Sequence, residues 1–181
     1  MKHIPRLIAW GSTPEEHAAA YPCDGYMQPP QRRLTRAIDV QVPADLTFQW
    51  ICQIKLAPYS YNWIDNLGRR SPALLPPGTE RLAKGQHFML FEIVDFSQDR
   101  HMTGVVRPRL QGIAGKQAIT YQVSSTGPHS SRIIVCIDLP QRRWIDRVQF
   151  SNIFAAGDLI MMRKQLQNLK AYTEGDSSRE A

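Results

Sequence analysis

Apolar and polar positions alternate with a period of two in five stretches of the chain, a pattern typical of β-strands covered on one face. In the first stretch Leu34, Ile38 and Val40 share one parity, while Thr35 and Asp39 share the other. Turn residues separate the later stretches. The predicted strands lie at about 34–42, 87–96, 100–107, 117–124 and 131–139. We expect an antiparallel sheet with one face packed against a covering layer.

Two short helices are expected after the first strand. Pro43 suits a first helical turn, and apolar residues recur every four positions from Leu46 to Ile54, which gives that helix a buried face. Ser60 can cap a second helix, which Gly68 is placed to terminate. Both helices precede the later strands, so the pattern indicates an α+β domain.

The longest amphipathic segment lies near the C-terminus and predicts one helix over 151–172. At 1.5 Å per residue this helix would be about 33 Å long, roughly the length of a strand of nine or ten residues. It can therefore lie across a whole sheet face. Its expected inward stripe consists of Phe150, Ile153, Phe154, Gly157, Ile160 and Met161, and continues through Leu166, Leu169 and Tyr172.

The N-terminal region carries a helix start signal of its own. Thr13 and Glu16 have the spacing of a capping box, and Pro14 suits the first turn between them. Residues 22–31 are rich in proline and are expected to form an irregular connection. We expect an N-terminal extension with a short helix at 1–31, one domain at 32–174 and a frayed tail at 175–181.

Length and composition are those of a soluble globular domain. The chain has 181 residues, of which 43% are hydrophobic and 21% charged, enough for one core without disulfides or metals. No apolar run approaches the roughly 18 residues of a membrane span. The N-terminal MKHIPRLIAW is too short in apolar residues for a signal peptide. We therefore expect a cytoplasmic protein.

The chain is basic, with a formal charge of +6 and a pI near 9.5. An excess of basic residues raises the question of a nucleic acid or anionic surface as partner. The basic residues are scattered rather than gathered in a stripe or tail that would follow a phosphate backbone. They occur in pairs such as Arg32-Arg33, Arg69-Arg70 and Arg142-Arg143. Nucleic acid is therefore not the expected partner.

No metal-binding motif is visible. The five histidines are widely spaced, and neither a CxxC nor an HExxH spacing occurs. Cys23, Cys52 and Cys136 are odd in number and far apart, and the last two lie within apolar segments. We interpret the three cysteines as buried, inert thiols and expect neither a metal nor a cofactor. A metal shell assembled from residues distant in sequence is the alternative.

Several motifs resemble the START-like, polyketide cyclase/dehydrase (SRPBCC) superfamily, specifically bacterial members with a YSYDWLENL-type motif. The likeness runs from about residue 10 to residue 172. The matching segments are Trp10 to Thr13, Thr35 to Ile38, Gln49 to Ile54, YSYNWIDNL at 59–67 and GDLIMMRKQL at 157–166. Asn62 stands where the motif has aspartate.

The resemblance implies a helix-grip fold, in which a curved antiparallel sheet wraps around a long C-terminal helix and encloses an apolar cavity. Members of the superfamily bind lipids, sterols, hormones or polyketides there, and some catalyse cyclisation or dehydration. The candidates for ligand contact in this chain are Arg36, Tyr61, Trp63, Met89, Tyr121, Phe154, Met161 and Gln165. For proton transfer they are Tyr121 and His87.

Each candidate has an alternative structural role. The Tyr121 hydroxyl could reach a ligand carbonyl or be satisfied by backbone. Gln165 falls on the inward side of the last helix and needs a ligand, a water or a strand carbonyl as partner. Arg36 lies on the apolar parity of its strand, where it either pairs with a ligand carboxylate or lies at the sheet rim. Trp63 is interpreted as core and Tyr61 as pocket rim.

The sequence therefore predicts a protein that binds a small, largely apolar molecule of lipid, polyketide or aromatic type between sheet and helix. One alternative is a cyclase- or dehydratase-like enzyme acting in the same cavity. A second alternative is interaction with a protein or nucleic acid through the basic surface. The pattern determines neither the ligand nor the oligomeric state.

Overall fold

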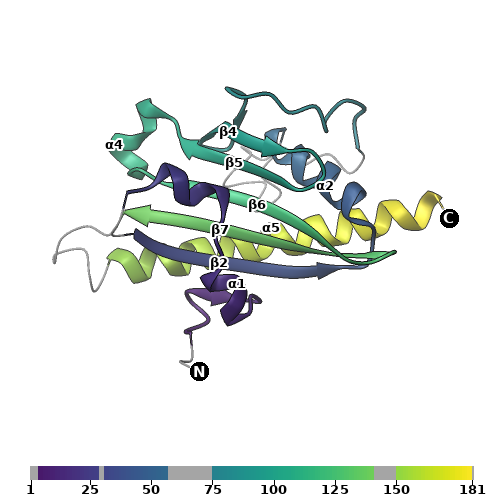
Figure 1. Ribbon diagram of the computed structural model, residues 1–181, viewed down its shortest axis with the longest axis horizontal. Helices are drawn as coiled ribbons and strands as arrows, with labels where there is room; N and C mark the ends of the chain where they lie inside the picture. The colour runs from purple at the N-terminus through teal and green to yellow at the C-terminus, as the bar shows by residue number, and fades with distance from the viewer. Residues whose placement is uncertain (1–3, 29–30, 57–74, 141–149, 181) are drawn as a thin grey trace.

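The computed structural model describes residues 4–28, 31–56, 75–140 and 150–180. Within them, seven strands form one curved sheet in the order β1-β2-β7-β6-β5-β4-β3. Figure 1 shows β2, β7, β6, β5 and β4 side by side. All neighbours are antiparallel except β1 and β2. The strands are β1 (Ala9–Trp10), β2 (Gln31–Val40), β3 (His87–Phe88), β4 (Phe91–Ser97), β5 (His101–Val106), β6 (Ala118–Gly127) and β7 (Ser130–Pro140).

The alternating stretches of the sequence are confirmed as strands, with one division. The run at 87–96 is interrupted by a tight turn at Met89 and Leu90, so that Phe88 pairs with Phe91 across a short hairpin. Met89 has a positive φ of 48°, which is uncommon for a residue other than glycine. The short strand β1, which pairs in parallel with β2, was not predicted from the pattern.

The helices are short except for the last. They are α1 (Pro14–Ala18), η1 (Pro22–Tyr26), α2 (Ala44–Cys52), η2 (Gln53–Lys55), η3 (Pro108–Leu110), α4 (Gln111–Ala114) and α5 (Phe150–Glu180). The capping box of α1 is confirmed, because the Glu16 amide donates to Thr13 Oγ1 at 3.2 Å and the Thr13 amide donates to Glu16 Oε2 at 2.8 Å. The proline-rich connection contains the 3-10 helix η1, where irregular structure was expected.

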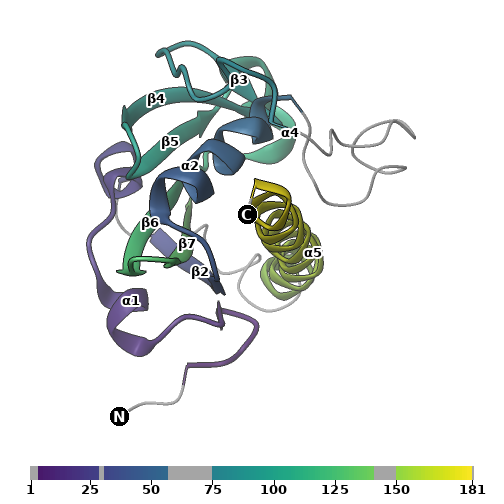
Figure 2. The same cartoon turned by 90° about the vertical axis from the view of Figure 1, so that its right-hand side faces the viewer.

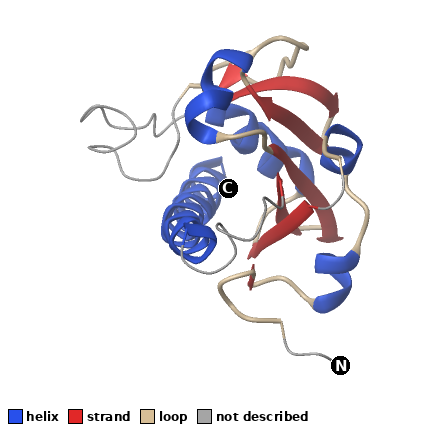
Figure 3. Ribbon diagram, turned by 90° about the vertical axis from the view of Figure 1, so that its left-hand side faces the viewer, coloured by secondary structure: helices blue, strands red, loops and turns tan. Residues whose placement is uncertain are grey.

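Both faces of the sheet are covered. Helices α5 and α2 lie on the concave face, and the N-terminal segment with α1 and η1 lies against the other face (Figures 2 and 3). The main hydrophobic core lies between the concave face and α5, where Leu34, Tyr121 and Val135 meet Leu166. A second, smaller cluster on the outer face contains Tyr21 of the N-terminal segment.

The predicted long C-terminal helix is confirmed, but its inward face is rotated from the expected stripe. Ile160 and Met161 are exposed by 58% and 38%, whereas the next residue, Met162, is buried. The described buried residues of α5 are Ala155, Met162, Gln165, Leu166, Leu169 and Thr173. The helix extends to Glu180, and the frayed tail stays a prediction.

Two expectations are not addressed by the described residues. The second short helix, with Tyr61 and Trp63, lies outside them. The proposed boundary between an N-terminal extension and the main domain stays a prediction. No helix within the described ranges is both long and apolar enough to cross a membrane.

Candidate ligand site between the sheet and the last helix

A hydrogen-bonded pair of polar side chains lies buried between the sheet and α5. Tyr121 lies near the middle of β6 and is fully buried, and its hydroxyl donates to Gln165 Oε1 of α5 at 2.8 Å. Burial raises the pKa of Tyr121, with a smaller contribution from the charge of Asp158. The phenol therefore remains a neutral hydrogen-bond donor at physiological pH.

Two methionine thioethers lie beside this pair. Met162 Sδ lies 3.8 Å from the Tyr121 hydroxyl, and the Gln165 amide nitrogen donates to Met89 Sδ at 3.6 Å. Sulfur is a weak acceptor that accommodates ligands and side chains of varied shape. We call Tyr121, Gln165, Met89 and Met162 the inner polar cluster.

Hydrogen bonds to its backbone and to its side chain hold Met89 in the turn. The Arg107 guanidinium donates to the Met89 carbonyl at 3.2 Å, and Gln165 binds its sulfur. The left-handed φ of Met89 is a strained conformation for a residue with a side chain, and such strain persists only where the surroundings impose it. The thioether is therefore held in a defined position beside Gln165.

Aromatic packing supports Tyr121 from the side of the sheet. The Phe88 ring meets the Tyr121 ring edge to face, with centroids 6.2 Å apart, and stacks on Phe91 at 5.4 Å. Phe88 lies over Gly104 of β5, where an added Cβ would be 2.5 Å from the ring. Because Gly104 has no side chain, the Phe88 ring has room to pack on the concave face.

A buried ion pair lies on the same face. Arg36 of β2 is fully buried, and its guanidinium donates to Asp158 Oδ2 of α5 at 2.8 Å. It also donates to the carbonyls of Leu7, Ile8 and Thr35. Among the described residues Arg36 Nε has no hydrogen-bond partner.

Burial decides how this pair titrates. It raises the pKa of Asp158 to about 6, against the opposing effect of Arg36, and it lowers the pKa of Arg36. The carboxylate side chain is only 10% exposed, so the desolvation of its charged form outweighs its one described ion pair. Asp158 is therefore protonated more readily than an exposed aspartate.

The structure unites three of the ligand candidates and separates others. Tyr121, Gln165 and Met89 contact one another directly or through a shared partner. Met161 is more than a third exposed, and Arg36 is occupied by Asp158 rather than lying at a rim. The expected partner of Gln165 was a ligand, a water or a strand carbonyl, whereas the structure provides the Tyr121 hydroxyl.

The remaining candidates are placed as follows. Tyr61 and Trp63 lie outside the described residues, and Phe154 lies in α5 with its side chain outside them. His87 is exposed on β3, and because successive side chains of a strand point to opposite faces, it points away from the core that holds Phe88.

Sequence reasoning missed Asp158. Asp158 lies one turn before Met162 and two turns before Gln165, so the three share a helix face. Arg36 lies on the apolar parity of its strand, and a buried charge needs an opposite charge as partner. Asp158 is an acidic residue that could have been considered as that partner.

Comparisons with known proteins find likeness in structure only. No protein-family model matches the chain, and no curated protein does. Among solved structures, the chain is similar to protein MLL2253 from Mesorhizobium loti, with 11% identity, coverage of 78% of this chain and 96% of the other, and a TM-score of 0.47.

Two further likenesses are of the same order. A START superfamily protein from Mycobacterium smegmatis is 12% identical, with 82% of this chain and 99% of that chain covered and a TM-score of 0.45. The di-domain ARO/CYC BexL from the BE-7585A biosynthetic pathway is 10% identical, with 79% of this chain and 46% of that chain covered and a TM-score of 0.42. At these identities the likeness says nothing of a ligand or a reaction.

The chain's own elements carry the structural conclusion. The first long strand, the curved antiparallel sheet and the long last helix on its concave face occur in the predicted order (Figure 1). This chain has the helix-grip architecture that the sequence resemblance predicts.

Proposed function

We propose that the protein binds a small, largely apolar molecule carrying a carbonyl or similar acceptor, between the concave face of the sheet and α5. The buried hydrogen bond between Tyr121 and Gln165, at 2.8 Å, is the observation that carries the proposal. Apolar side chains of similar shape could fill the same space without a desolvation penalty. The polar pair therefore offers a ligand a hydrogen-bond donor and an acceptor within this apolar layer.

The chemistry of the inner polar cluster fits such a ligand. The phenol is a neutral donor, and the Gln165 amide can both donate and accept, so a ligand carbonyl can take the Tyr121 hydroxyl in place of Gln165 Oε1. The two thioethers on either side adapt to different apolar outlines. The apolar residues of the surrounding core, such as Phe88 and Leu166, would contact the rest of the molecule.

Binding is favoured over catalysis on the same geometry. The described partners of the Tyr121 hydroxyl are an amide and a thioether, and neither exchanges protons with it at neutral pH. A cyclase or dehydratase needs an acid and a base within hydrogen-bond reach of the reacting atoms. The exposed position of His87 does not supply that partner.

The direct test is titration of the purified protein with Nile red, an apolar dye that carries a carbonyl and fluoresces more strongly in apolar surroundings. We expect saturable binding at one dye per chain. Tyr121→Phe removes the donor and Gln165→Met removes the amide at nearly constant size, and each should weaken binding about tenfold, equivalent to about 1.4 kcal/mol.

Thr173→Val is the matched control. Thr173 is also buried on α5, but its hydroxyl donates to the Leu169 carbonyl of its own helix, and it lies about 12 Å along the axis from Gln165. Its substitution should leave dye affinity unchanged. Absence of saturable binding by the natural protein, or equal affinities for all four proteins, would refute the proposal. Native mass spectrometry of freshly purified protein would then identify any molecule that co-purifies.

A further inference from the structure

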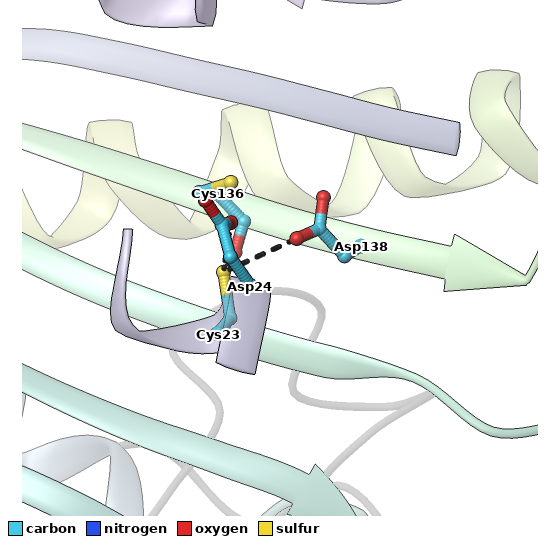
Figure 4. A group of neighbouring side chains, drawn as sticks. All are labelled: Cys23, Asp24, Cys136 and Asp138. Atoms are coloured by element: carbon cyan, nitrogen blue, oxygen red, sulfur yellow. Dashed lines mark hydrogen bonds between the residues drawn. The ribbon is translucent and has the colours of Figure 1, made fainter. Parts of the chain in front are cut away.

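A second polar cluster lies on the opposite, outer face of the sheet. Cys23 and Asp24 of η1 face Cys136 and Asp138 of β7 (Figure 4). The two sulfur atoms and one oxygen of each carboxylate all lie within 4.8 Å of one another. Cys23, Cys136 and Asp138 are fully buried, and the Asp24 side chain is 34% exposed. The cluster thus has a dry interior and one side open to solvent.

Tertiary structure alone brings these groups together. Cys136 and Asp138 are two positions apart on β7 and therefore point to the same face. Cys23 is 113 positions away from Cys136 along the chain. The Cys23 amide donates to Thr120 Oγ1 of β6 at 3.0 Å, which fixes η1 over the sheet.

We propose that Cys23, Asp24, Cys136 and Asp138 bind a single divalent transition metal, zinc in the first instance, which fastens the N-terminal segment to the outer face of the sheet. No CxxC or HExxH spacing in the sequence marks this site. A site built from η1 and β7 escapes any rule based on spacing.

The donor set and its dimensions suit zinc. Zinc takes cysteine sulfur at about 2.3 Å and carboxylate oxygen at about 2.0 to 2.2 Å, and structural sites are four-coordinate and tetrahedral. The edges of such a tetrahedron are about 3.3 to 3.8 Å long. Cys23 Sγ already lies 3.7 Å from Asp138 Oδ2 and 3.9 Å from Asp24 Oδ1. The largest separation, at most 4.8 Å, exceeds the longest tetrahedral edge by about 1 Å.

Arg33 provides the outer support that such a site requires. Its guanidinium donates to Asp138 Oδ1 at 3.1 Å and Oδ2 at 3.3 Å, and also to Asp24 Oδ1. Hydrogen bonds from outside orient ligating carboxylates. Two thiolates and two carboxylates carry four negative charges, of which a divalent metal and Arg33 offset three. Arg33 is itself held over the Tyr21 ring, 5.6 Å from its centroid.

The first experiment needs no variant. The full chain, free of affinity tag and purified with a reducing agent but without chelator, is analysed for zinc by inductively coupled plasma mass spectrometry. It is then titrated with Co²⁺. We expect one zinc per chain, and for cobalt the visible bands of a tetrahedral site together with a thiolate-to-cobalt charge-transfer band in the near ultraviolet.

Variants then assign the ligands. Cys23→Ser, Cys136→Ser and Asp138→Asn should each weaken zinc affinity by at least about tenfold in competition with a chromophoric chelator. Cys52→Ala is the matched control, because Cys52 is equally buried but lies on α2 within the main core. Its zinc content should equal that of the natural protein.

Four outcomes would overturn the proposal. The natural protein could bind neither zinc nor cobalt, or the cobalt spectrum could lack the thiolate band. Metal binding could persist unchanged in Cys23→Ser and Cys136→Ser. Finally, peptide mapping without reduction could reveal a disulfide between Cys23 and Cys136, with no metal taken up after its reduction. None of these outcomes depends on Nile red binding, so the two proposals stand or fall separately.

Discussion

The substitution Asp158→Asn tests whether burial or the ion pair with Arg36 has the larger effect on the pKa of Asp158. The substitution keeps the shape of the side chain and an oxygen that can accept from Arg36, but it removes the titration. In the folded protein burial raises the pKa of Asp158 to about 6, whereas its ordinary value is 3.8. Between these values the folded state binds a proton that the unfolded state has lost.

The sign and size of the change in the free energy of unfolding follow from the linkage between protonation and folding. Because the folded state binds the extra proton, the stability that Asp158 contributes is fully present below about pH 4 and is lost as pH rises through 6. Each pH unit of separation between folded and unfolded pKa values corresponds to about 1.36 kcal/mol. The free energy of unfolding of the natural protein minus that of Asp158→Asn should therefore fall by about 2 to 3 kcal/mol between pH 4 and pH 7.5.

Urea denaturation followed by tryptophan fluorescence measures this difference at half-unit steps of pH and constant ionic strength. Titrations of other groups occur in both proteins and cancel in the difference. Asp45→Asn, at an exposed position in the first turn of α2, is the control for the exchange of an aspartate by asparagine. A difference that stays constant, or that rises with pH, would show that the ion pair with Arg36 outweighs burial and would refute the reasoning.

Glycine positions give three further predictions, each measured as a change in the free energy of unfolding in urea. Gly104→Ala should destabilise by about 1 to 3 kcal/mol, because the new methyl would lie 2.5 Å from the Phe88 ring; an unchanged midpoint would mean that the ring moves freely. Gly11→Ala should also destabilise the folded protein, since Gly11 has a φ of +73° and its added Cβ would be 2.1 Å from the Ala37 carbonyl oxygen. An unchanged free energy of unfolding would contradict that packing. Gly157→Ala, exposed on α5 with nothing near the new methyl, should stabilise by about 0.5 to 1 kcal/mol, and a loss of stability there would contradict the helix.

Local patterns were sufficient for the strands from β2 onwards and for the helices α1, α2 and α5. The period of two located β2 and the later strands to within a few residues, because alternation reports directly which face of a strand is covered. The capping box of α1 depends on residues three positions apart, and such short-range geometry is visible in the sequence. The long last helix followed from its amphipathic length.

The sequence did not predict to within one position which residues of α5 face the sheet. Met161 and Met162 are adjacent and equally apolar, and they point about 100° apart, so the pattern could not choose between them. Contact with Tyr121 selects Met162. The turn at Met89 was hidden because its positive φ falls on a methionine, whereas the usual sequence signal for that conformation is a glycine.

The sequence by itself determined the elements, their order and the START-like resemblance, because these depend on side chains that are neighbours along the chain. Only the tertiary structure decided that Arg36 meets Asp158, that Tyr121 meets Gln165 and that Cys23 meets Cys136. Each pair joins segments far apart in the chain. Their contact depends on the strand register and on how α5 and η1 pack against opposite faces of the sheet, and no local periodicity encodes that packing.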